Sequence, residues 1–132
     1  MDDERRRLND LSARLLLLHG VLLERERAAY ESRHGALTPP ELLRLLLGDD
    51  YFAWLRSLSQ LIARIDEAVD SDTPELDSVA GAFVRETSDL VRSGGSDAFA
   101  TKYAAALQES PDVVMAHAEV VKLLGRRQEG RS

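Results

Sequence analysis

The sequence contains no cysteine, a single tryptophan, only 5% aromatic residues and no excess of basic residues. Without cysteine there can be no disulfide, no thiolate metal site and no cysteine nucleophile, although the redox compartment stays open. The formal net charge of −6 argues against a nucleic-acid-binding protein, which needs a basic face to contact phosphates. The two basic clusters, at residues 5–7 and 126–131, lie at the chain ends, as solvated tails usually do.

Long hydrophobic runs are also missing. The stretches Leu15–Leu18 and Val21–Leu23 are far shorter than the roughly 20 apolar residues that cross a bilayer. The first ten residues alternate in charge and lack the apolar segment of a signal peptide, so we expect a cytoplasmic protein. With 132 residues, of which 44% are hydrophobic and 30% charged, the composition is typical of one globular domain.

Hydrophobic residues recur at helical spacing along most of the chain, and no alternating strand pattern occurs, which predicts an all-α fold. We expect helices at residues 3–33, 41–47, 50–69, 75–92, 97–109 and 111–124. Short connections predict an antiparallel bundle in which the first, third, fourth and sixth helices are long and the other two shorter. The bundle domain is expected to cover residues 1–125, with Gly125 ending the last helix before a disordered tail at 126–132.

Helix-stop and helix-start signals place several of these boundaries. Gly35 is expected to end the first helix as a left-handed C-cap. The sequence Thr38-Pro39-Pro40-Glu41 predicts a capping box with proline in the first turn. A second cap-and-proline start is predicted at Thr73-Pro74, and Gly94-Gly95 predicts a linker.

The helix at residues 3–33 has an unusual distribution of leucine. Leu8, Leu11, Leu15, Leu18 and Leu22 form one stripe at helical spacing. The further residues Leu16, Leu17, Val21 and Leu23 widen the stripe until the middle of the helix is apolar almost all round. Such a helix is expected to be surrounded, either by the rest of the bundle or by a second subunit. The glycine in its centre, Gly20, would let a neighbouring backbone approach closely.

Two histidines and the tryptophan are candidate ligand-binding residues. His19 and His117 both fall on apolar helix faces, where a buried imidazole must find a hydrogen-bond partner or a ligand. Each is therefore expected to be either a hydrogen-bonded core residue or an axial haem or metal ligand. Trp54 is expected in the core beside Phe52, with a role as an interface anchor as the alternative.

Glu31-Ser32-Arg33-His34 spells Glu-x-x-His, the pair that di-iron bundles place on one helix face, so Glu31 and His34 are candidate metal ligands. Dinuclear sites use two such pairs, whereas the chain has one, at a helix end where His34 could satisfy terminal carbonyls instead. The sequence contains no P-loop, no GxGxxG, no GxSxG and no HExxH motif.

The run from His34 to Asp66 contains the elements HGxLxPxELLxLLL and FAWLR. In these elements it resembles small stand-alone bacterial helical proteins of unknown function. The resemblance covers about a quarter of the chain and implies an all-helical fold, with no assigned activity, cofactor or site.

These observations favour a non-enzymatic interaction or structural module. We expect it to form a homodimer, through the first helix or through the elbow between the second and third helices. The alternative is a bundle that binds haem, a metal or a hydrophobic ligand through its histidines. An enzyme with a site assembled from scattered polar residues is the third possibility. The sequence identifies no particular cofactor.

Overall fold

In the computed structural model, which describes residues 2–71, 75–93 and 97–131, the described chain is helical and contains no β-strand. The elements are α1 (Asp2–His34), α2 (Pro39–Gly48), the 3-10 helix η1 (Asp50–Leu55), α3 (Arg56–Ser71), α4 (Leu76–Ser88), the π-helical turn η2 (Asp89–Ser93), α5 (Asp97–Glu109) and α6 (Pro111–Arg131). The predicted all-α class is confirmed. The predicted helix start at Thr73-Pro74 and the predicted Gly94-Gly95 linker lie outside the described residues.

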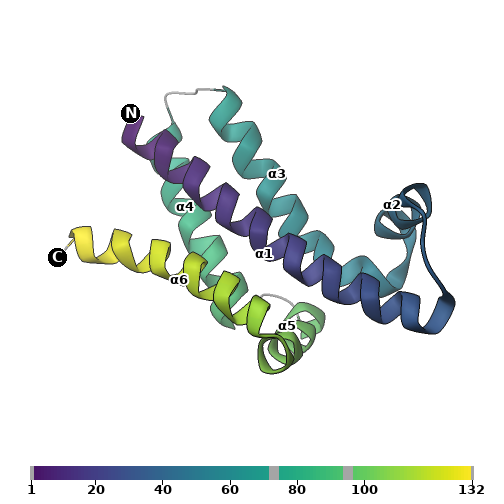
Figure 1. Ribbon diagram of the computed structural model, residues 1–132. Helices are drawn as coiled ribbons and strands as arrows, with labels where there is room; N and C mark the ends of the chain where they lie inside the picture. Colours follow the sequence, from purple (N-terminus) through teal and green to yellow (C-terminus); the bar gives the residue numbers. More distant parts are fainter. Residues whose placement is uncertain (1, 72–74, 94–96, 132) are drawn as a thin grey trace.

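Helix α1 is the element around which the others are arranged. It lies between α3 and α6, and it also contacts α4 and η1 (Figure 1). The core is built from buried hydrophobic side chains on α1, η1, α3, α4, η2, α5 and α6, whereas α2 buries no residue fully. From α1 the core receives the predicted stripe Leu8, Leu11, Leu15, Leu18 and Leu22. None of the helices in the described ranges is long and apolar enough to span a membrane.

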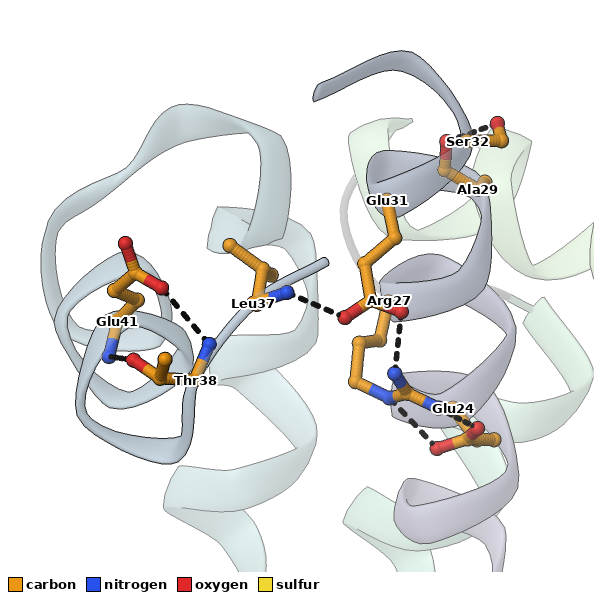
Figure 2. Close-up of polar contacts among 8 residues, drawn as sticks. All are labelled: Glu24, Arg27, Ala29, Glu31, Ser32, Leu37, Thr38 and Glu41. Carbon is orange, nitrogen blue, oxygen red and sulfur yellow. Dashed lines mark hydrogen bonds and ion pairs between the residues drawn. The ribbon is translucent and has the colours of Figure 1, made fainter. Parts of the chain in front are cut away.

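The connection from α1 to α2 has the local structure that its sequence predicts. Gly35 has φ +90°, and its N–H donates to the carbonyl of Glu31 at 2.8 Å. Thr38 accepts from the N–H of Glu41 at 3.3 Å, and the Glu41 carboxylate accepts from the N–H of Thr38 at 2.8 Å (Figure 2). This is the expected capping box, and it starts α2 at Pro39, two residues before the predicted boundary.

The single α-helix predicted at residues 50–69 is wrong in its first part. Residues 50–55 form the 3-10 helix η1, and the α-helix begins at Arg56. The Asp49 carboxylate caps η1 by accepting from the N–H of Tyr51 at 2.8 Å. The tighter winding places Phe52, Trp54 and Leu55 in the core together.

Two other helix ends differ from the prediction. The helix expected to end at Arg92 finishes in the wider π turn η2, which allows the adjacent side chains Leu90 and Val91 both to be buried. Gly125 does not end α6, whose backbone continues to Arg131. A glycine inside a helix costs only about 1 kcal/mol, and the following Arg-Arg-Gln-Glu sequence favours helix. The predicted division into one domain and a tail stays a prediction.

Candidate functional site

The side of α1 that faces away from the core carries exposed leucines. Leu16 is 59% exposed and Leu17 is 66% exposed. With Gly20, Val21 and other residues they line a surface groove of about 500 Å³, which reaches Ser110 and Asp112 at the start of α6. A Cβ atom added at Gly20 would meet no heavy atom within 4 Å, so no other element of the chain fills the space above this glycine.

Helix α6 carries an exposed apolar residue, Met115, on the edge that faces α1. Arg14 of α1 forms an ion pair with Glu119 at 3.8 Å, and Asp112 lines the groove, so both acidic residues lie on the edge of α6 that faces α1. Met115 lies three residues after Asp112 and four before Glu119, which places it on the same helix edge. It is 70% exposed. We refer to Leu16, Leu17, Gly20, Val21 and Met115 as the outer patch.

A second groove, of about 400 Å³, runs between α1 and the elbow formed by α2, η1 and α3. We refer to it as the α2 groove. Its lining residues come from four elements and are His19, Leu43, Leu46, Leu47, Phe52, Leu55, Arg56, Ser59 and Gln60. The Arg56 guanidinium donates to the carbonyls of Leu46 and Asp49, both at 3.4 Å, and so ties α2 to α3.

His19 is the candidate ligand residue that faces a groove. It is half-buried on α1, and burial lowers the pKa of its imidazole. A neutral imidazole at the wall of an apolar groove can exchange a hydrogen bond with one polar group of a ligand. This is the chemistry that the α2 groove offers.

His117 has a partner within the chain. Its Nδ1 shares a hydrogen bond of 2.7 Å with the hydroxyl of the buried Tyr103 on α5. Burial is the main cause that lowers the pKa of His117, and the nearby positive charge of Arg92 lowers it further. Burial also raises the pKa of the Tyr103 phenol strongly. His117 therefore faces α5 whereas His19 faces the α2 groove, and the structure does not bring the two imidazoles to one site.

Trp54 is a core residue with a satisfied N–H group. The residue is 6% exposed, and its indole N–H donates to the carboxylate of Glu26 at 3.3 Å. Glu26 is itself buried and pairs with Arg25 at 3.1 Å. The Trp54 ring packs against Phe99 with a centroid distance of 5.4 Å. Trp54 lines neither the outer patch nor the α2 groove, so its predicted role in the core fits its surroundings better than ligand binding.

The Glu31 carboxylate is occupied by protein donors. One oxygen accepts from the Arg27 guanidinium at 2.5 Å and the other from the N–H of Leu37 at 2.7 Å (Figure 2). His34 is exposed, and its ring lies 4.3 Å from that of Tyr30. Among the described residues, no three His, Cys, Asp or Glu side chains are placed to hold a metal ion. The Glu31 contacts point to a structural role in fixing the turn between α1 and α2.

The sequence does not predict a surface patch at Leu16, Leu17 and Met115. It shows that Leu16 and Leu17 are apolar, but their exposure depends on which elements cover α1. For Leu17, the signal that could have found it is a second helical stripe on α1, opposite the core stripe, in which Ala13, Leu17 and Gly20 recur at helical spacing.

The two histidines with lowered pKa values predict a pH-dependent stability. The unfolded chain takes up protons near the ordinary histidine pKa of about 6.5, whereas the folded chain resists protonation of His19 and His117. Stability is therefore fully present above that pKa and falls as the pH drops below it. Urea unfolding at about pH 7.5 and about pH 5.5 should show this loss, because the interval spans that pKa. His117→Gln should make the loss smaller, because it removes one of the two imidazoles whose pKa is lowered in the folded chain.

No family model, curated protein or solved structure compared with the chain matches it. The resemblance of residues 34–66 to small bacterial helical proteins therefore stays a prediction, and no activity is transferred to the chain from a relative.

Proposed function

We propose that the protein is a non-enzymatic interaction module that forms a homodimer through the outer patch. The observation that carries this proposal is the exposure of Leu16 and Leu17 beside the open space above Gly20. Large exposed apolar side chains that adjoin one another are typical of protein interaction sites, whereas scattered ones are not. The outer patch has this contiguity because Leu16, Leu17, Gly20 and Val21 line one groove.

The fold supports the same proposal. Helix α1 is covered by α3, α4 and α6 on its core side, and the outer patch is on the side that these helices leave uncovered. We include in the proposal that the helices form an antiparallel bundle with α1 as a central member. A second α1 would then complete the enclosure that its leucine distribution predicts.

Replacing Leu17 by glutamate is the direct test. The protein should be dimeric, and L17E should raise the dimer dissociation constant by about 30-fold or more, because a charge would be buried in the centre of an apolar contact. Sedimentation over a range of concentrations measures the constant, and native mass spectrometry confirms the dimer mass. The matched control is Leu47→Glu, an exposed leucine on α2 outside the outer patch. A wild-type protein that stays monomeric at high concentration would contradict the proposal.

The α2 groove favours a second candidate function, the binding of a hydrophobic molecule with one polar group near His19. Its volume of about 400 Å³ lies in the range of small-molecule sites. Its walls are mainly leucine and phenylalanine side chains. The same mass spectra test this candidate, because a ligand would appear as a reproducible extra mass that is lost in His19→Ala while the dimer persists.

A further inference from the structure

We propose that the two copies of α1 pair antiparallel about a midpoint between Leu18 and His19, so that Leu17 of each copy packs on Gly20 of the other. This inference rests on the proposed homodimer and adds the direction and register of its helices. It follows from the residues that α1 presents along its uncovered side.

These residues recur in alternating steps of four and three, the spacing that keeps one seam facing a second helix. We refer to them as the outer seam. Every member is exposed or half-exposed, and in chain order they are Arg6, Asp10, Ala13, Leu17, Gly20, Glu24, Arg27 and Glu31. The centre of the outer seam is apolar and small, and both of its ends are charged.

The charges at the two ends are complementary when the helices run in opposite directions. About the proposed midpoint, Asp10 of one copy lies opposite Arg27 of the other, and Arg6 lies opposite Glu31. Because the dimer has two-fold symmetry, each of these pairs occurs twice. Parallel helices would instead place each charged residue opposite its own copy, and like charges in contact weaken an interface.

The register is selected by the same charges. If the pairing moves by one step of the seam so that Leu17 meets Leu17, Asp10 lies opposite Glu24. If it moves the other way, so that Gly20 meets Val21, Asp10 lies opposite Glu31. Both shifted registers bring carboxylates together, and of these three registers only the central one pairs opposite charges at both ends.

The centre of the seam has complementary shape in this register. Leu17 is 66% exposed, and the space above Gly20 is open. Without a Cβ atom, Gly20 lets the second helix approach closely, and the Leu17 side chain fills the resulting hole as a knob. A glycine in a helix interior costs about 1 kcal/mol relative to alanine, and this contact compensates for that cost.

The charged end of the seam carries a net negative charge. Arg27 bonds to both Glu24 and Glu31 along α1 (Figure 2). Two carboxylates and one guanidinium leave one negative charge there. In the proposed register Arg6 of the second copy lies opposite Glu31 and adds a guanidinium to this cluster, while Asp10 of the second copy adds a carboxylate opposite Arg27, so the pairing brings in no further net charge. A stable interface buries roughly 1,200–2,000 Å² in total, more than the few apolar side chains supply, so the contact must include these charged ends.

Exchange of the charges between two chains tests the register. In D10R and in R27E, the two symmetry-related Asp10–Arg27 pairs of the homodimer become repulsive, whereas the Arg6–Glu31 pairs are unchanged. Each dissociation constant should rise roughly tenfold at low ionic strength. Mixed together, the two variants form a heterodimer in which both contacts between positions 10 and 27 are attractive. Native mass spectrometry should then show about nine-tenths heterodimer instead of the statistical half. The double variant D10R/R27E should regain the wild-type dissociation constant.

Circular dichroism confirms that each variant keeps its helices, and Glu67→Arg on the exposed face of α3 is the matched control for charge reversal. A statistical mixture of D10R and R27E, with dimerisation still weakened by L17E, would overturn the register and leave the proposed function standing. Preferential pairing of D10R with wild type would indicate parallel helices and overturn the inference. The pairing of D10R with wild type can be measured even if the R27E variant does not fold. A monomeric wild type would remove both proposals.

Discussion

Replacing Phe99 by alanine is expected to lower the free energy of unfolding by about 3–5 kcal/mol, because a fully buried aromatic side chain leaves a cavity that its neighbours fill only in part. Phe99 is 0% exposed. Its ring lies 5.4 Å from Trp54 on η1 and 5.2 Å from Tyr103 on α5, between centroids. Tyr103 in turn bonds to His117 on α6. Phe99 thus joins α5 to the elbow and, through Tyr103, is linked to α6.

Urea unfolding followed by circular dichroism measures this loss. Phe99→Leu is the control, since it keeps most of the volume and should cost clearly less than Phe99→Ala. The Phe99→Ala protein should also expose Tyr103 and Trp54 to water, which the tryptophan fluorescence reports. A loss below about 1 kcal/mol would show that the helices close over the site, and that this aromatic cluster does not hold α5 in place.

Local sequence signals predicted the helix ends that depend on neighbouring residues alone. The C-cap at Gly35 and the capping box of Thr38 and Glu41 both require only contacts within a few residues. The change from 3-10 to α-helix at Arg56 could not be predicted in this way. It depends on burying Phe52, Trp54 and Leu55 against other helices, and both winding types suit the same hydrophobic pattern.

For the candidate site residues too, the sequence predicts local features but not the contacts between helices. The sequence predicted that His117 needs a polar partner, but Tyr103 lies on another helix, so the partner follows from how α5 and α6 pack. The Glu-x-x-His spacing predicts a ligand pair, but the Glu31 carboxylate is bonded to Arg27 and to the N–H of Leu37. The spacing of residues places them on a face, and only the packing shows what that face meets.

The four consecutive leucines at residues 15–18 show most clearly that packing between helices decides which side chains are buried. They share residue type, helix and neighbourhood in the sequence, yet Leu18 is 0% exposed while Leu17 is 66% exposed. Leu18→Ala should therefore lower the free energy of unfolding of the monomer by about 2–5 kcal/mol, since it removes core contacts and leaves a cavity. Leu17→Ala should change it by less than about 0.5 kcal/mol, as expected for a surface substitution.

Urea unfolding of both variants should be measured at a concentration low enough for the wild type to be monomeric. The effects of the two substitutions on the dimer dissociation constant should have the opposite order. Leu17→Ala should weaken the dimer although it leaves the monomer stable, because Leu17 is the knob of the proposed contact. Leu18→Ala retains the exposed Leu17 and, where it is folded, should dimerise like the wild type. If the two alanine variants lost monomer stability equally, the outer side of α1 would be covered within the chain, and no second copy would be needed to explain its leucines.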